Sequence, residues 1–135
     1  MSKKHKTKWR DQTQDSDLEA AAAYLSLLFE PDQTRAIIAA FRKAPVEKRQ
    51  AKDILRASQT HLLDRKNPDV KKDLKKIKKD EPLNPVLLVR GNGANGATLA
   101  IADGYHRICA AWHWDEEAPI ACCLVSVPKG REHAG

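Results

Sequence analysis

The sequence predicts an α+β fold in which a small β-sheet is flanked by helices. A continuous apolar run over 86–89 is typical of a buried strand. Apolar residues alternate over 99–101 and then recur at helical spacing from 106 onward, so a strand gives way to a helix. Between positions 18 and 79, apolar residues repeat every three or four positions in several segments, which indicates amphipathic helices.

The composition fits one compact domain without a membrane segment. The chain has 135 residues, of which 31% are charged and 41% hydrophobic, values ordinary for a soluble protein. No apolar run approaches the ~20 residues that a membrane helix needs, and the basic start lacks the apolar core of a secretory signal. The three cysteines include the neighbours Cys122 and Cys123, which point to opposite faces of a strand and are not placed to bridge each other. We therefore expect a reducing, cytoplasmic setting.

Residues 1–14 and 15–45 precede the predicted sheet and differ in character. The first segment is basic, with Trp9 as its only apolar anchor, and is interpreted as a disordered tail or as a basic arm for a polyanion. The second is predicted to form a helical hairpin with helices over 18–29 and 33–43, broken at Pro31. Two roles are open for this hairpin: packing against the sheet, or forming the surface of a homodimer.

The principal domain is predicted over 46–128, followed by a tail over 129–135. It begins with helices over 46–58 and 67–79 and continues with strands over 86–90, 98–102 and 120–125. Val70, Leu74 and Ile77 form the buried stripe of the helix over 67–79. Most of its other positions are basic: Lys71, Lys72, Lys75, Lys76, Lys78 and Lys79. They are interpreted as a solvated face, or as a ridge that attracts nucleotides or nucleic acid, although no aromatic residue in the ridge offers base stacking.

The change of period at Asp103 and Gly104 places a tight turn before a helix. A helix N-terminus carries unpaired backbone N–H groups and partial positive charge. His106 and Arg107 lie on its first turn. Such an end binds anions readily, and phosphate is the natural ligand.

At these residues the chain resembles the ParB/sulfiredoxin superfamily. The resemblance covers about 54–127 and rests on the strand over 85–89, a glycine-rich hairpin over 91–96, the segment 101–107 and the strand over 120–125. It implies a small mixed sheet and a phosphate-binding turn made by Gly104, Tyr105, His106 and Arg107. It also implies a nucleoside di- or triphosphate with Mg²⁺ as ligand, because members of the superfamily use ATP, CTP or ADP. Arg107→Ala is then expected to abolish nucleotide binding and leave the fold intact.

The chain also departs from the named branches. Tyr105 stands where a sulfiredoxin has its reactive cysteine, which removes that activity. Tyr105, His106 and Cys109 replace a glutamate and two arginines of the ParB pattern, and the DNA-binding domain of ParB has no counterpart. The reaction therefore stays unassigned, with nucleotide hydrolysis or phosphotransfer to a small molecule as the enzymatic options.

Each site residue has more than one interpretation. His106 is either a structural hydrogen-bonding group, a phosphate donor or a general acid/base. Asp103 either caps the helix, holds Mg²⁺ or takes part in catalysis. Arg107 either binds phosphate or pairs with Asp103, and Tyr105 either packs or contacts the ligand. Cys109 is interpreted as core, with a metal site alongside Cys122 and Cys123 as the alternative.

Two functions follow from these patterns. The first is phosphate or nucleotide binding at Gly104, His106 and Arg107. The second is accessory nucleic-acid binding through the basic segments 3–10 and 71–79, which the formal net charge of +6 permits. We expect the first.

Overall fold

A computed structural model describes residues 5–91 and 98–128. Most of the glycine-rich hairpin, the first four residues of the basic tail and the tail over 129–135 lie outside the described residues. The elements follow the chain in this order: α1 (Asp15–Leu25), α2 (Pro31–Lys43), β1 (Glu47–Gln50), α3 (Ala51–Ser58), α4 (Pro68–Lys78), β2 (Val86–Arg90), β3 (Leu99–Asp103), α5 (Tyr105–Trp114) and β4 (Pro119–Ser126).

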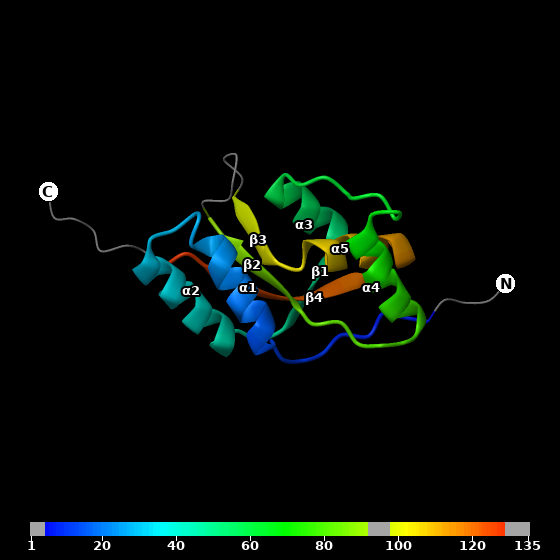
Figure 1. Cartoon of the computed structure of the whole chain (residues 1–135), viewed down its shortest axis with the longest axis horizontal. Helices are drawn as coiled ribbons and strands as arrows, with labels where there is room; N and C mark the ends of the chain where they lie inside the picture. The colour runs from blue at the N-terminus through cyan, green and yellow to red at the C-terminus, as the bar shows by residue number, and fades with distance from the viewer. Residues whose placement is uncertain (1–4, 92–97, 129–135) are drawn as a thin grey trace, which may run out of the picture.

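The four strands form one mixed sheet in the order β1-β4-β2-β3. β2 pairs parallel with β4, whereas β1 with β4 and β2 with β3 pair antiparallel. Helices flank this sheet (Figure 1), which confirms the predicted α+β class. β3 is an edge strand, so the turn that follows it lies at the edge of the sheet, as predicted.

The sheet separates two hydrophobic clusters, one on each face. Along β2, Val86 and Leu88 belong to the cluster under α3, α4 and α5, whereas Leu87 and Val89 belong to the cluster under α1 and α2. Both faces of β2 are buried, which explains its uninterrupted apolar sequence. Cys122 and Cys123 likewise lie in opposite clusters, and the expectation that they point apart is confirmed.

The N-terminal helical hairpin packs against the sheet. α1 contacts β3 and α2 contacts β4, which confirms the first of its two predicted roles; the homodimer surface stays a prediction. α2 begins at Pro31, whose missing N–H costs nothing at the first helical position. Within the described residues, no helix has the length and hydropathy required to cross a bilayer.

Two predictions about the first sixty residues differ from the structure. The helix expected over 46–58 begins only at Ala51, because 47–50 form the edge strand β1 paired with β4. Residues 5–14, expected as a disordered tail, lie against the body of the protein. Trp9 forms a bridge with Leu83 and packs against the core, and the backbone N–H of Arg10 donates to the Leu83 carbonyl over 2.8 Å.

Candidate functional site

The turn between β3 and α5 has the geometry that the change of period predicts. β3 ends at Asp103, and Gly104 takes φ +105°, the left-handed region that glycine adopts without strain. An added Cβ on Gly104 would lie 2.5 Å from Cγ1 of Val86. Glycine is therefore required here both by the backbone angle and by the close approach to β2.

The first turn of α5 presents backbone N–H groups without a side-chain cap. The first hydrogen bond of the helix runs from the Ile108 N–H to the Gly104 carbonyl over 3.0 Å. The N-cap residue, Gly104, has no side chain that could accept a hydrogen bond from the amides of residues 105–107. Asp103 does not cap the helix, which corrects one interpretation of this residue. The amides of residues 105–107 lie before that first bond and carry the partial positive charge of the helix end.

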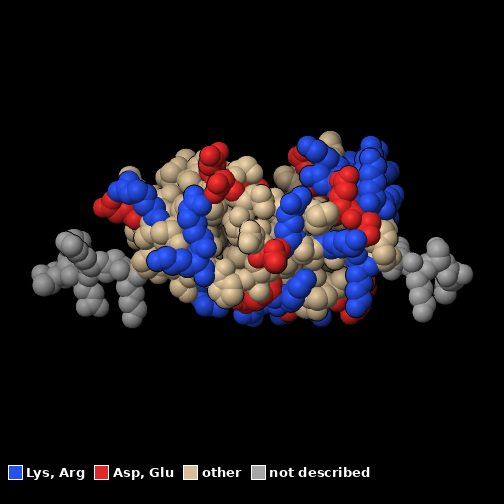
Figure 2. Space-filling model, turned by 90° about the horizontal axis from the view of Figure 1, so that it is seen from below, with Lys and Arg blue, Asp and Glu red and all other residues tan. Residues whose placement is uncertain are grey.

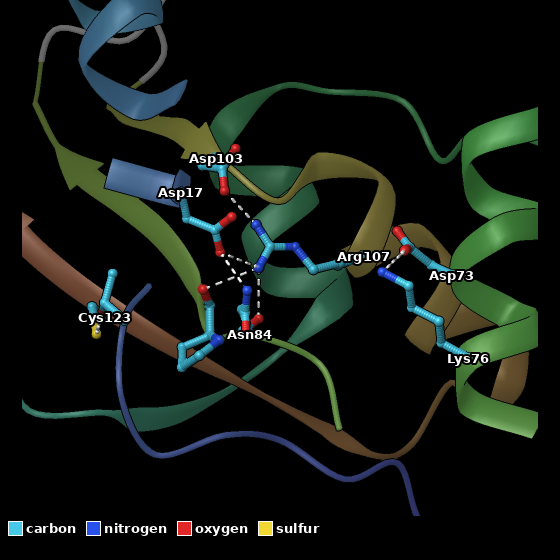
Figure 3. Close-up of polar contacts among 9 residues, drawn as sticks. Asp17, Asp73, Lys76, Asn84, Asp103, Arg107 and Cys123 are labelled. Atoms are coloured by element: carbon cyan, nitrogen blue, oxygen red, sulfur yellow. Dashed lines mark hydrogen bonds and ion pairs between the residues drawn. The ribbon is translucent and has the colours of Figure 1, made fainter. Parts of the chain in front are cut away.

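Arg107 is held by four groups of the protein itself. Its Nη1 donates to Asp17 Oδ2 over 3.0 Å and to the Asn84 carbonyl over 2.8 Å, and also contacts the Pro85 carbonyl, while Nη2 donates to Asp103 (Figure 3). The side chain is 13% exposed. The guanidinium therefore joins α5 to α1, to the start of β2 and to β3. The interpretation that Arg107 pairs with Asp103 is confirmed.

The two carboxylates on Arg107 are themselves largely buried. The side chains of Asp17 and Asp103 are 18% and 19% exposed, and Asn84 Nδ2 donates to Asp17 Oδ2 over 3.0 Å. Burial raises the pKa of Asp103; the positive charge of Arg107 works against this rise, and the charge of Asp17 adds to it. Because two carboxylates share one guanidinium, this group of three side chains carries an excess of negative charge when both are ionised.

A polar pocket of about 290 Å³ opens in front of this group. It is lined by Arg107 and its side-chain neighbours Asp17, Asn84 and Asp103, which we call the Arg107 cluster. The other lining residues are Arg10, Asp73, Lys76, Pro82, Leu83, Gly104 and His106. Lys76 Nζ lies 4.0 Å from Asp73 Oδ1, at the outer limit of an ion pair (Figure 3). Arg10 makes no ion pair with any residue in 5–91 and 98–128. Arg10 and Lys76 therefore have no close carboxylate partner among the described residues, although Asp17, Asp73 and Asp103 also line the pocket.

A second hollow, of about 400 Å³, adjoins the polar pocket at the same turn. Asp103, Gly104 and His106 line both. The rest of the second hollow is lined by β3, by three polar residues (Ser58, Gln59 and Thr60), and by Ala20, Tyr24 and Tyr105. It is therefore the more apolar of the two, and the residues that they share are Asp103, Gly104 and His106.

The structure brings together the four residues predicted to bind phosphate, but their side chains differ in orientation. The hydroxyl of Tyr105 donates to the backbone carbonyl of His61. His106 Nε2 lies 3.6 Å from Asp69 Oδ2, and His106 is among the residues that line both hollows. Of the predicted side-chain donors, His106 is the more exposed, at 43% with Asp69 beside it, whereas Arg107 is engaged within the protein.

The predicted lysine ridge is divided by the structure. Lys76 lines the polar pocket, whereas Lys71, Lys75 and Lys78 line a separate hollow and Lys72 lines neither. In the described ranges, no three His, Cys, Asp or Glu side chains are grouped so that they could hold a metal ion. Among these residues, neither the predicted Mg²⁺ on Asp103 nor the alternative metal site at the cysteines therefore has three protein ligands grouped around it.

Four residues of the site are not predicted by the sequence: Arg10, Asp17, Asp73 and Asn84. Asp17 lies in the first turn of α1, where an acidic residue is favourable to the helix dipole and gives no sign of a distant partner. Arg10 belongs to the segment expected to be a tail. Asp73 is the one acidic residue within the lysine-rich part of α4, and that contrast is the single local signal that could have found it.

Comparison with protein-family models, with curated proteins and with solved structures finds no match to this chain. The resemblance to the ParB/sulfiredoxin superfamily accordingly stays a prediction, and the basis for a function is the geometry of the turn and its two hollows.

Proposed function

We propose that this protein binds a nucleoside phosphate at the N-terminus of α5. The phosphates occupy the polar pocket, and the nucleoside occupies the adjoining hollow along β3. The observation that carries the proposal is that the two hollows meet at Gly104 and His106. A ligand that is anionic at one end and flat and less polar at the other fits this pair.

The phosphate donors in this proposal are the amides of the first turn of α5, His106, Lys76 and Arg10. A helix N-terminus binds phosphate through oriented N–H groups and its dipole. Lys76 is held only by a 4.0 Å contact with Asp73, so a phosphate oxygen can replace that partner at little cost. Any Mg²⁺ enters with the nucleotide, because Mg²⁺ at such sites is commonly bound through substrate phosphates.

Arg107 has a different role from the one that the superfamily resemblance implies. Its Nη atoms are engaged by Asp17, Asp103 and Asn84. Releasing the guanidinium to a ligand would leave two largely buried carboxylates unpaired, which is costly. Arg107 is therefore proposed as a positioning residue that holds the turn in place, and no reaction is assigned to the site.

The proposal is tested by calorimetric titration of ATP, ADP and CTP, each with Mg²⁺, into the full chain. His106→Ala and Lys76→Met are expected to weaken binding by about tenfold or more each, since a hydrogen bond to a charged group contributes about 1.5–3 kcal/mol. Lys72→Met, on the same helix but outside both hollows, is the matched control and should bind as the parent does. Absence of heat with all three nucleotides, or equal losses in Lys72→Met and Lys76→Met, would refute the proposal.

A further inference from the structure

Five cationic side chains line a hollow of about 260 Å³ beside α4 that shares no residue with the polar pocket. The hollow is lined by Arg65, Lys66, Lys71, Leu74, Lys75 and Lys78, with no acidic residue among them. We call the five cations the α4 basic cluster. In Figure 2 Lys and Arg side chains gather, with some Asp and Glu among them, at the end of the molecule where Figure 1 places α4. Lys71, Lys75 and Lys78 recur at intervals of four and three residues and therefore share one side of the helix.

None of these five cations is neutralised within the described part of the chain. Arg42, Arg49 and Arg56 each have a carboxylate partner within 3.3 Å, whereas no carboxylate of residues 5–91 and 98–128 lies within 4.0 Å of a charged nitrogen in the α4 basic cluster. All five residues are exposed. Like charges kept close together without counter-charges raise the local potential and attract a polyanion.

The spacing of the cluster suits a repeated phosphate better than a single anion. Lys71 to Lys78 spans seven residues, about 10 Å along the helix axis at 1.5 Å per residue. A nucleic-acid strand carries one phosphate for every 3.4 Å or so of duplex axis, hence about three over that length. Arg65 and Lys66 extend the cationic surface beyond the helix. The hollow has Leu74 as its one apolar residue and no aromatic ring, so it offers nothing on which an unstacked base could lie.

We propose that the α4 basic cluster binds the phosphate backbone of a nucleic-acid duplex without reading its sequence. A duplex keeps its bases stacked and presents phosphates outward, which matches a surface with cations and no stacking groups. The structure thereby alters the ridge expected from the sequence: Lys76 belongs to the polar pocket, Lys72 and Lys79 do not line the hollow, and Arg65 and Lys66 join it. This proposal is independent of nucleotide binding at α5.

The test is fluorescence anisotropy of a short labelled duplex titrated with the full chain at several salt concentrations. DNA and RNA duplexes of the same sequence are compared, and unrelated sequences should bind equally. The triple variant Lys71→Gln, Lys75→Gln, Lys78→Gln is expected to bind at least about tenfold more weakly at low salt. The slope of log K against log salt should fall by about three, because each of the three lysines neutralises about one phosphate in the parent complex.

A second triple variant shows whether weaker duplex binding comes from loss of the α4 basic cluster or from the lower net charge of the protein. Lys43→Gln, Lys48→Gln, Lys52→Gln removes the same charge from exposed positions elsewhere and should retain binding within about threefold of the parent. Three outcomes would overturn the proposal. These are equal losses of duplex affinity in the two triple variants, no duplex binding at low salt, or binding of inorganic polyphosphate but not of a duplex. Calorimetry with nucleotide should be unchanged in the first triple variant, so failure of one proposal does not imply failure of the other.

Discussion

The guanidinium of Arg107 lies 3.0 Å from the carboxylate of Asp17, which precedes it by ninety residues in the chain. This contact joins the first helix of the N-terminal hairpin to the turn that heads α5. The hairpin is therefore not an appendage of the sheet domain: it covers one sheet face and also supplies a counter-charge at the candidate site. The fold and the site depend on the same pair of side chains.

Replacing Arg107 by alanine should destabilise the protein as well as disturb the site. The substitution leaves Asp17 and Asp103 largely buried without their cation, and loss of one partner from such a pair costs about 3 kcal/mol or more. Urea unfolding measures the change. Arg42→Ala is the matched control because Arg42 also pairs with α1, through Asp15 at 2.9 Å, but with exposed side chains. That control should lose less than about 1 kcal/mol. Equal losses would show that the Arg107 cluster is not a structural anchor.

Gly104→Ala should lower the free energy of unfolding by about 3 kcal/mol, combining the left-handed backbone cost with overpacking. The new methyl group would lie 2.5 Å from Val86 Cγ1 and 3.0 Å from Arg107 Nη2. Gly91→Ala provides the comparison, since Gly91 has φ +97° but its nearest neighbouring atom would be 3.7 Å away. It should lose only about 1 kcal/mol, the backbone cost alone. Similar losses in the two variants, measured by urea unfolding, would argue against close packing at the Gly104 turn.

Much of the fold could be predicted because it is encoded locally. The strand over 86–90 is buried on both faces and is apolar throughout its first four residues, and the turn at Gly104 coincides with a change of hydrophobic period. β1 escaped prediction because its sequence, Glu47–Gln50, is polar and becomes a strand only by pairing with β4 at the sheet edge. The packing of residues 5–14 against the body of the protein could not be predicted for the same reason. It depends on contacts of Trp9 and Arg10 with Leu83, which is distant in the sequence.

The candidate site was predictable only in part. Local sequence located the turn, His106 and the pairing of Arg107 with Asp103. The other partners, Asp17 and Asn84, come from segments up to ninety residues away, and no local pattern indicates them. A sequence pattern marks a residue as capable of binding phosphate. It does not show whether carboxylates of the protein itself pair with that residue in the folded state.

Asp73→Asn should stabilise the protein near neutral pH and have little effect in acid. Burial raises the pKa of Asp73 above 3.8, with Lys76 and Arg107 opposing the rise. The folded state therefore binds the carboxyl proton of Asp73 more tightly than the unfolded chain does. The stability that this proton contributes is fully present below pH 3.8 and is lost as the pH rises through the pKa of Asp73 in the folded state. Asparagine carries no charge at any pH, so its advantage over aspartate should grow across that interval.

The measurement is urea unfolding of the parent and Asp73→Asn at a series of pH values from about 3 to about 7. Asp53→Asn, which removes a carboxylate from an exposed position of α3, is the control for a change of net charge alone. A variant that is less stable than the parent at neutral pH and equal to it in acid would reverse the sign and show that the ionised carboxylate of Asp73 stabilises the fold, for example through Lys76.

The three cysteines should be unreactive in the folded protein. Cys109, Cys122 and Cys123 are free thiols with no exposed surface, and burial raises the pKa of Cys122 to about 12. Because the thiolate is the reactive form, a disulfide reagent at mildly alkaline pH should label none of them before the protein unfolds. All three should react in urea, over the same concentration range in which tryptophan fluorescence reports unfolding. Leu27→Cys, at a position 82% exposed, is the positive control and should add one rapidly labelled thiol. Rapid labelling of an original cysteine under native conditions would mean that one sheet face opens without global unfolding.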